Sequence, residues 1–174
     1  MTTLAENRFA FDGLVGADGA TYSLSSFEDK RVVVVVFAAN GCPTVRSLEP
    51  WLQEFQREYE RRGVQLVLVN SNNSSLSPRD THAEIVKRAR DSGYAFPYLK
   101  DDGGLVARGF GAVTTPHAFV LDEQRRLRYQ GRIADSRQAS TVTVPYLAQA
   151  VDEILAGRQV AVANTEPYGC SIVW

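Results

Sequence analysis

The chain has 174 residues, of which 44% are hydrophobic and 22% are charged. This length and composition predict a single folded domain whose core is large enough to need no disulfide scaffold. Lys and Arg number 19 against 20 Asp and Glu, without a basic stripe, which argues against a nucleic-acid partner. No apolar run could cross a bilayer, and residues 1–9 lack the apolar centre of a signal peptide, so we expect a cytoplasmic protein without a membrane partner.

The first predicted elements are short, and they lead into one very apolar strand. Residues 9–11 and 21–24 flank a glycine-rich turn and predict a small hairpin that precedes the main sheet. Residues 25–28 predict a short helical turn. Residues 32–37, five valines and a phenylalanine, are too apolar for a half-exposed strand and predict a strand buried on both faces.

A cysteine follows this strand at a predicted helix start. The chain turns at Asn40 and Gly41, and Cys42 comes directly before Pro43, a residue favoured at the first helical position. An apolar stripe at helical spacing follows, formed by Leu48, Trp51, Leu52, Phe55 and Tyr59. We expect the helix to end at Gly63. A cysteine at the positive end of a helix favours the thiolate over the thiol.

The middle of the chain alternates strands with helices. Residues 65–70 predict a second buried strand, and the polar run that follows predicts a loop. Thr81 and Glu84 form a capping box that opens a helix, which we expect to end at Gly93. A short extended piece at 96–99 and a brief helix at 105–110 come next.

The last third predicts a hairpin, a helix and a tail. Residues 114–121 and 126–130 predict two paired strands. A helix opened by Pro145 follows, and residues 158–174 form a tail without periodicity. Because the tail contains Tyr168, Ile172 and Trp174, we expect it to dock on the domain. The whole order predicts an α/β fold, a central mixed sheet with helices on both faces, an N-terminal hairpin and a C-terminal tail.

Several motifs are similar to those of thioredoxin-fold proteins. Residues 37–50 resemble the active-site segment of thioredoxin, with Cys42 as its first cysteine, and Thr115-Pro116 resembles the cis-proline that faces it. The whole chain resembles the peroxiredoxin-like branch of the AhpC/TSA redoxins, which share the Cys-Pro pair, a Thr-Pro-His-x-Phe segment and a Gly-Cys-Ser-Ile-x-Trp C-terminus. This resemblance implies a thioredoxin-like fold and a thiol-based redox protein, an antioxidant or a thiol–disulfide oxidoreductase.

The chain also departs from these families. Val45 stands where thioredoxin has its second cysteine, so the usual local disulfide cannot form. Val35 and Ala39 replace the proline and threonine that precede the peroxiredoxin cysteine, and the peroxiredoxin arginine has no clear counterpart. Donors that polarise the O–O bond are therefore missing, which predicts weak or no ordinary peroxidase activity.

The predicted site has a nucleophile, a possible second thiol and a wall. Cys42 would attack a disulfide or peroxide substrate, and Cys170 either resolves the intermediate or packs beside Trp174 on the surface. The wall residues are Asn40, Gly41, Pro43, Thr44, Thr115 and Pro116. An external thiol would act as reductant. We assign no cofactor and no metal to this interpretation, and we expect a monomer or weak dimer.

Two other functions stay open. One is a redox-inert binding module that uses the cis-proline face. The other is a metal chaperone that uses Cys42, His117 and Cys170, although their spacing matches no known metal motif. We expect His82 to be solvated and Arg46 to face solvent.

Overall fold

The computed structural model describes residues 8–174, so the predicted absence of a signal peptide falls largely outside the described residues. Within the described part of the chain, no helix is both long and apolar enough to cross a membrane. A seven-stranded mixed sheet forms the centre, in the order β2-β1-β5-β4-β3-β7-β8. Strands β3, β4 and β5 are parallel, whereas β1, β2, β7 and β8 pair with their neighbours in antiparallel fashion.

The bounds of the elements follow the chain. The sheet strands are β1 (Leu14–Gly16), β2 (Thr21–Tyr22), β3 (Val32–Phe37), β4 (Val64–Asn70), β5 (Tyr98–Lys100), β7 (His117–Leu121) and β8 (Leu127–Gly131). The α-helices are α2 (Pro43–Tyr59), α3 (His82–Ser92), α4 (Leu105–Phe110) and α5 (Tyr146–Leu155). Short 3-10 helices are η1 (Leu24–Phe27), η2 (Glu60–Arg62), η3 (Pro78–Asp80) and η4 (Ala139–Thr141). A separate two-stranded sheet joins β6 (Thr114–Thr115) to β9 (Cys170–Ser171).

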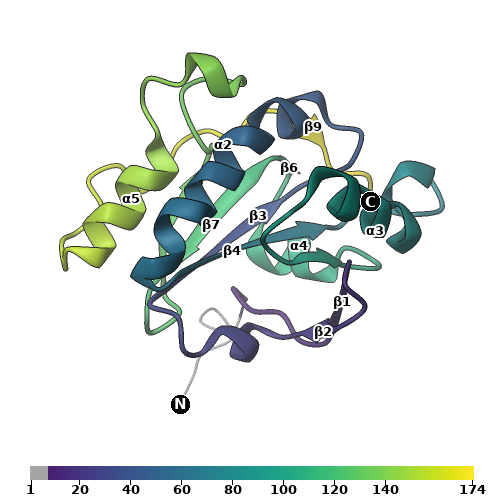
Figure 1. Cartoon of the computed structure of the whole chain (residues 1–174), viewed down its shortest axis with the longest axis horizontal. Coiled ribbons are helices and arrows are strands. Elements are labelled where there is room, and N and C mark those ends of the chain that lie inside the picture. The colour runs from purple at the N-terminus through teal and green to yellow at the C-terminus, as the bar shows by residue number, and fades with distance from the viewer. Residues whose placement is uncertain (1–7) are drawn as a thin grey trace.

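Strand β3 is buried on both faces, as its sequence predicts. Its six side chains are completely inaccessible, and alternate ones enter two different clusters. Val34 packs with residues of α2 and α5 on one face, and Val35 packs with residues of η1 and α4 on the other. Figure 1 shows α2 and α5 together on one side of the sheet. The central mixed sheet with helices on both faces is therefore confirmed.

The helix ends follow the predicted signals. Helix α2 begins at Pro43, and η2 continues it to Gly63, which has a positive φ of 78°. Thr81 caps α3 by accepting a hydrogen bond from the Glu84 backbone N–H, and Gly93 ends that helix in the left-handed conformation. These ends form where predicted because capping depends on residues adjacent in sequence.

Two predictions about strands need correction. The N-terminal hairpin is present, but its first strand is β1, inside the glycine-rich stretch, and β1 pairs with β5, so the hairpin is part of the main sheet. The predicted strand over 114–121 is broken at Pro116 into β6 and β7. Since proline has no N–H to donate, it interrupts the hydrogen-bond ladder at this point.

Candidate active site

Cys42 lies at the N-terminus of α2, just beyond the end of β3. It is the N-cap residue, Pro43 is the first helical residue, and Cys42 is 2% exposed. The thiol makes no capping hydrogen bond to the helix, and its Sγ instead donates to the backbone carbonyl oxygen of Thr115 at 3.2 Å. The neutral thiol is thus aimed at the segment that precedes Pro116.

The Thr115-Pro116 peptide bond is cis, as predicted. Its strand, β6, pairs in antiparallel fashion with β9, which places Cys170 opposite Thr115 and Ser171 opposite Thr114. In Figure 1 the yellow C-terminal segment with β9 passes beside β6, near the start of α2. Cys170 also packs against the hydrophobic cluster that contains Cys42. The structure therefore brings together the two cysteines, which are far apart in the sequence, with both thiols free.

The pKa values of the two thiols are shifted in opposite directions. Burial opposes ionisation of Cys42, but hydrogen bonds from Cys170, from the Thr115 side chain and from the backbone of Val45 outweigh it and lower the pKa of Cys42. Burial and the neighbouring Cys42 sulfur raise the pKa of Cys170 to about 11. The pair therefore consists of one thiol that ionises more readily than an ordinary cysteine and one that ionises less readily and donates to it.

The turn before Cys42 is fixed by Asn40. Its Oδ1 accepts a hydrogen bond from the Tyr98 hydroxyl at 2.9 Å, and its Nδ2 donates to the backbone carbonyl of Arg79 at 2.8 Å. Both ends of the Asn40 amide are therefore engaged away from the Cys42 sulfur. Asn40 instead holds the backbone from which Cys42 projects.

A buried carboxylate supports the same turn. Asp80, which is 2% exposed, accepts hydrogen bonds from the backbone N–H of Asn40 and from the side chains of Asn70, Asn72 and Ser77. Burial raises the pKa of such a group, but these four donors outweigh burial, so the pKa of Asp80 lies below its usual value. Asp80 is thus charged at neutral pH and stabilised by donors from three segments.

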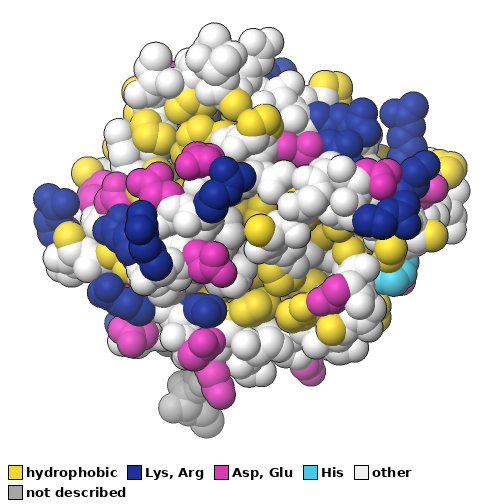
Figure 2. Space-filling view, viewed as in Figure 1, with side chains coloured by type: hydrophobic (Ala, Val, Ile, Leu, Met, Phe, Trp, Pro, Cys, Tyr) yellow, Lys and Arg dark blue, Asp and Glu magenta, His cyan; other side chains and the backbone are white. Residues whose placement is uncertain are grey.

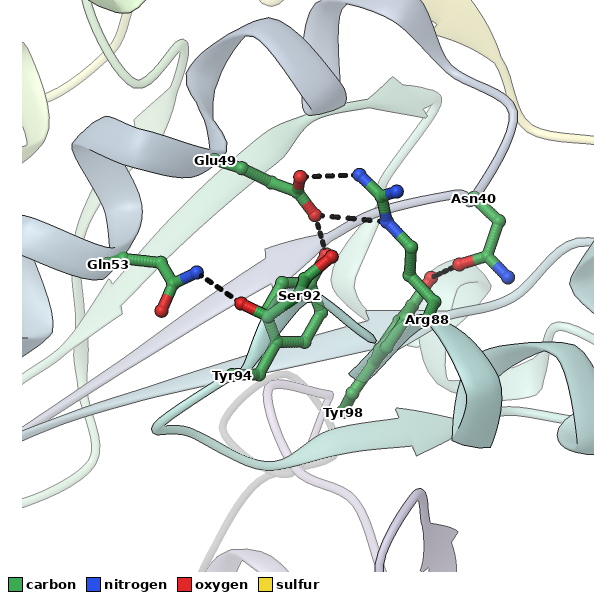
Figure 3. Close-up of polar contacts among 7 residues, drawn as sticks. All are labelled: Asn40, Glu49, Gln53, Arg88, Ser92, Tyr94 and Tyr98. Atoms are coloured by element: carbon green, nitrogen blue, oxygen red, sulfur yellow. Dashed lines mark hydrogen bonds and ion pairs between the residues drawn. The ribbon is translucent and has the colours of Figure 1, made fainter. Parts of the chain in front are cut away.

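Figure 3 shows a second polar network that joins α2 to α3. Glu49 of α2 forms a bidentate ion pair with Arg88 of α3 and also accepts a hydrogen bond from the Tyr94 hydroxyl. One helical turn further along α2, Gln53 donates to the backbone carbonyl of Ser92 at 2.9 Å. These contacts fix the first half of α2 relative to α3, and hence the helix end that carries Cys42.

The other predicted wall residues differ in exposure. Thr44 is buried, whereas Gly41 and Pro43 are exposed. Arg46 faces solvent, as expected, and lines a pocket of about 400 Å³ together with Arg79 and Lys87. Figure 2 shows basic side chains gathered on the side of the molecule that carries α3.

The two histidines do not form a metal centre. His117 is 4% exposed, its Nδ1 accepts from the backbone N–H of Val113 at 3.4 Å, and burial lowers its pKa to about 4. His82 is half-buried rather than fully solvated, and its Nε2 lies 2.9 Å from the carbonyl oxygen of Gly16. Across residues 8–174 no three His, Cys, Asp or Glu side chains are placed to hold a metal ion, so the metal-chaperone alternative gains no support.

Sequence reasoning missed the supporting residues Asp80, Asn70 and Asn72. The polar run at the end of β4 leads into a loop, as predicted, but Asn70, Ser71 and Asn72 are all buried. A signal was available, because the carboxyl ends of the parallel strands β3 and β4 meet at one edge of the sheet. Polar residues that directly follow β4 must therefore lie near Cys42.

Comparisons with known proteins agree with this architecture. A family model described as Redoxin matches residues 5–150 of the chain. The crystal structure of a hypothetical protein from Sinorhizobium meliloti 1021 is 34% identical, with a TM-score of 0.86, and the match covers 95% of this chain and 94% of that chain.

Two further likenesses are more distant. A thiol:disulfide interchange protein of the thioredoxin family from Chlorobium tepidum TLS has 24% identity and a TM-score of 0.64, covering 84% of this chain and 93% of that chain. The thiol-disulfide oxidoreductase ResA of Bacillus thuringiensis subsp. konkukian is 16% identical over 122 residues, covering 65% of this chain and 66% of the relative. The chain thus matches just under two thirds of that relative's length. These likenesses show the thioredoxin-like fold, as predicted.

Proposed function

We propose that this chain, which belongs to the redoxin family, is a thiol–disulfide oxidoreductase in which Cys42 is the nucleophile and Cys170 the resolving thiol. The observation that carries the proposal is the register of β6 and β9, which sets Cys170 opposite Thr115, whose carbonyl accepts from Cys42. The distant relatives named for thiol–disulfide exchange agree with this chemistry.

The first step uses the lowered pKa of Cys42. Its thiolate attacks one sulfur of a disulfide; the S–S bond breaks, a mixed disulfide forms on Cys42, and a thiolate leaves and takes up a proton. With a hydroperoxide the O–O bond breaks instead, giving a sulfenic acid on Cys42 and an alcohol or water. Cys170 is the nearest thiol proton donor in either case.

The second step becomes easier once the first is complete. The charge of Cys42 and its hydrogen bond to Cys170 both raise the pKa of Cys170, after the larger effect of burial. A Cys42 sulfur bound in a mixed disulfide carries no charge, so the pKa of Cys170 falls at that stage. The Cys170 thiolate then attacks the Cys42 sulfur and forms the Cys42–Cys170 disulfide. The leaving group is the second substrate thiolate from a mixed disulfide, which takes up a proton, or hydroxide from a sulfenic acid, which becomes water. In sum, the protein loses two hydrogens and one substrate disulfide becomes two thiols.

The test is an intact-mass and free-thiol measurement on the fully reduced protein after one equivalent of a small disulfide or of hydrogen peroxide. We expect the wild type to lose two thiols and two mass units. Cys170→Ser should stop at the mixed disulfide or sulfenic acid on Cys42, and Cys42→Ser should react no faster than a free cysteine. Survival of both thiols in the wild type would instead favour a redox-inert binding module.

A further inference from the structure

The segment after α5 returns across the molecule and is bound along its length. Gln130 at the outer strand β8 exchanges backbone hydrogen bonds with Ala163 and Thr165. The segment then reaches β6, and beyond it the backbone N–H of Ile172 donates to the carbonyl of Val113 at 3.2 Å. The last residues are held by Asn73, whose backbone N–H donates to the Val173 carbonyl at 2.7 Å. We call residues 159–174 the C-terminal strap.

The strap occupies a position that an extended polypeptide would need. An unpaired strand edge binds an added strand through main-chain hydrogen bonds. In the described residues β6 has β9 as its only partner, and β6 contains the Thr115 carbonyl that contacts Cys42. A substrate strand that brought its cysteine to Cys42 along this edge would occupy the place of Cys170 and its neighbours.

The fit of the strap to this edge is close, and apolar anchors hold it there. A Cβ built on Gly169 would lie 2.0 Å from the Thr115 carbonyl oxygen, so only a glycine fits between the two backbones. Ile172 is 5% exposed and belongs to the second core cluster. The Arg108 guanidinium lies over the ring of Trp174, 4.5 Å from its centroid. Displacement of the strap would thus expose apolar surface and break main-chain hydrogen bonds.

From this arrangement we infer that the strap is a specificity element, which limits the substrate to a low-molecular-mass oxidant and excludes polypeptide disulfides. The inference rests on the proposed function, because it concerns the electrophile that Cys42 attacks. A small disulfide needs only a local opening at Cys42, whereas a polypeptide disulfide needs the whole β6 edge. The strap contains the second cysteine, Cys170, so it lies on β6 in the position that the inference gives to a substrate strand.

The test is carried out in a Cys170→Ser background, where β9 is kept and a mixed disulfide on Cys42 accumulates. Its rate of formation is followed by intact mass with two probes, bis(2-hydroxyethyl) disulfide and insulin. Gly169→Ala pushes the strap away from Thr115, and deletion of residues 172–174 removes its anchors in a second, independent way. The matched control is Gly157→Ala, which also places a side chain at a positive φ, of 72°, but whose Cβ meets no atom within 4 Å, so it separates backbone strain from contact with Thr115.

We expect insulin to react far more slowly than the small disulfide in the background protein and in the Gly157→Ala control. Deletion of residues 172–174 should raise the insulin rate, relative to the small-disulfide rate, by about tenfold or more, because loss of the buried Ile172 shifts an opening equilibrium by that order. Gly169→Ala should raise the same ratio, because its Cβ cannot fit beside the Thr115 carbonyl. An unchanged ratio in both strap variants would overturn the inference and leave the proposed function intact. Absence of any adduct on Cys42 with the small disulfide would refute the proposed function itself.

Discussion

The carboxylate of Asp80 gives the sharpest test of how the Cys42 turn is held. Asp80→Ala leaves the backbone N–H of Asn40 and the Nδ2 of Asn72 without the acceptor they bond in the folded chain, at 2.9 and 3.0 Å. Asn70 loses one bond but keeps its contact with the Tyr98 hydroxyl at 3.0 Å. Two buried donors at ~1–3 kcal/mol each, with the lost charge-assisted bonds, give a destabilisation of about 3–5 kcal/mol.

The measurement is urea-induced unfolding at pH 7, with Asp102→Ala as the matched control. Asp102 is an exposed carboxylate near Asp101, and its removal should change the free energy of unfolding by no more than ~0.5 kcal/mol. A loss of about 3–5 kcal/mol is a large part of the free energy of unfolding of a typical domain, which is ~5–15 kcal/mol. The variant stays folded if the wild-type value is near the upper end of that range. The rate of Cys42 alkylation should change as well, because Asn40 sets the backbone before Cys42.

The contribution of Asp80 to the free energy of unfolding should depend on pH in a definite direction. The folded-state pKa of Asp80 lies below the usual value of 3.8, so its stabilising effect is present above that value and disappears as the pH falls through the folded-state pKa. The difference in the free energy of unfolding between wild type and Asp80→Asn should therefore narrow below pH ~4. This account of the turn would be refuted if the Asp80 variants lost no more free energy of unfolding at pH 7 than Asp102→Ala. A loss that does not vary with pH would refute it too.

Three further predictions concern neighbouring groups. Thiolate absorbance should show one thiol that ionises below the usual cysteine pKa and one near 11, and Cys170→Ala should raise the pKa of Cys42 by removing a donor; equal titration of both thiols would contradict this. Glu49→Gln should destabilise the protein by about 1–3 kcal/mol in thermal or urea unfolding, because it breaks the half-buried pair with Arg88, and an effect no larger than that of the exposed Glu54→Gln would count against the network. Burial lowers the pKa of His117 to about 4, so the unfolded chain binds more protons and stability should fall as the pH drops from 6.5 towards 4; His117→Asn should flatten that slope in urea unfolding, and an unchanged slope would show that His117 is not its source.

The parts of the fold that sequence predicts are those fixed by neighbouring residues. The apolar run of β3 specifies burial on both faces without reference to any partner. The start of α2 depends on Cys42 and Pro43, and the end of α3 depends on Gly93, all within one helical turn. Such local signals were enough to identify Cys42 as the candidate nucleophile.

Composition does not predict the burial of one polar segment. The run of Asn and Ser after β4 predicts a loop, and residues 71–77 do form one, but Asn70 and Asn72 bind the buried Asp80. Composition misses these contacts because it ignores neighbours that are distant in sequence. Asn40 is 40 residues from Asp80, and its backbone N–H donates to that carboxylate.

The second thiol shows the same limit more strongly. Strand β9 has two residues, too few for any alternation to predict it, and its partner Thr115 lies 55 residues earlier. Pattern alone could therefore place Cys42 at a helix end and leave the position of Cys170 open. In the structure both cysteines contact Thr115: its carbonyl accepts a hydrogen bond from the Cys42 thiol, and its strand pairs with Cys170. Since the strap fits that strand only where residue 169 has no side chain, Gly169 is the residue whose sequence identity bears most directly on the pairing.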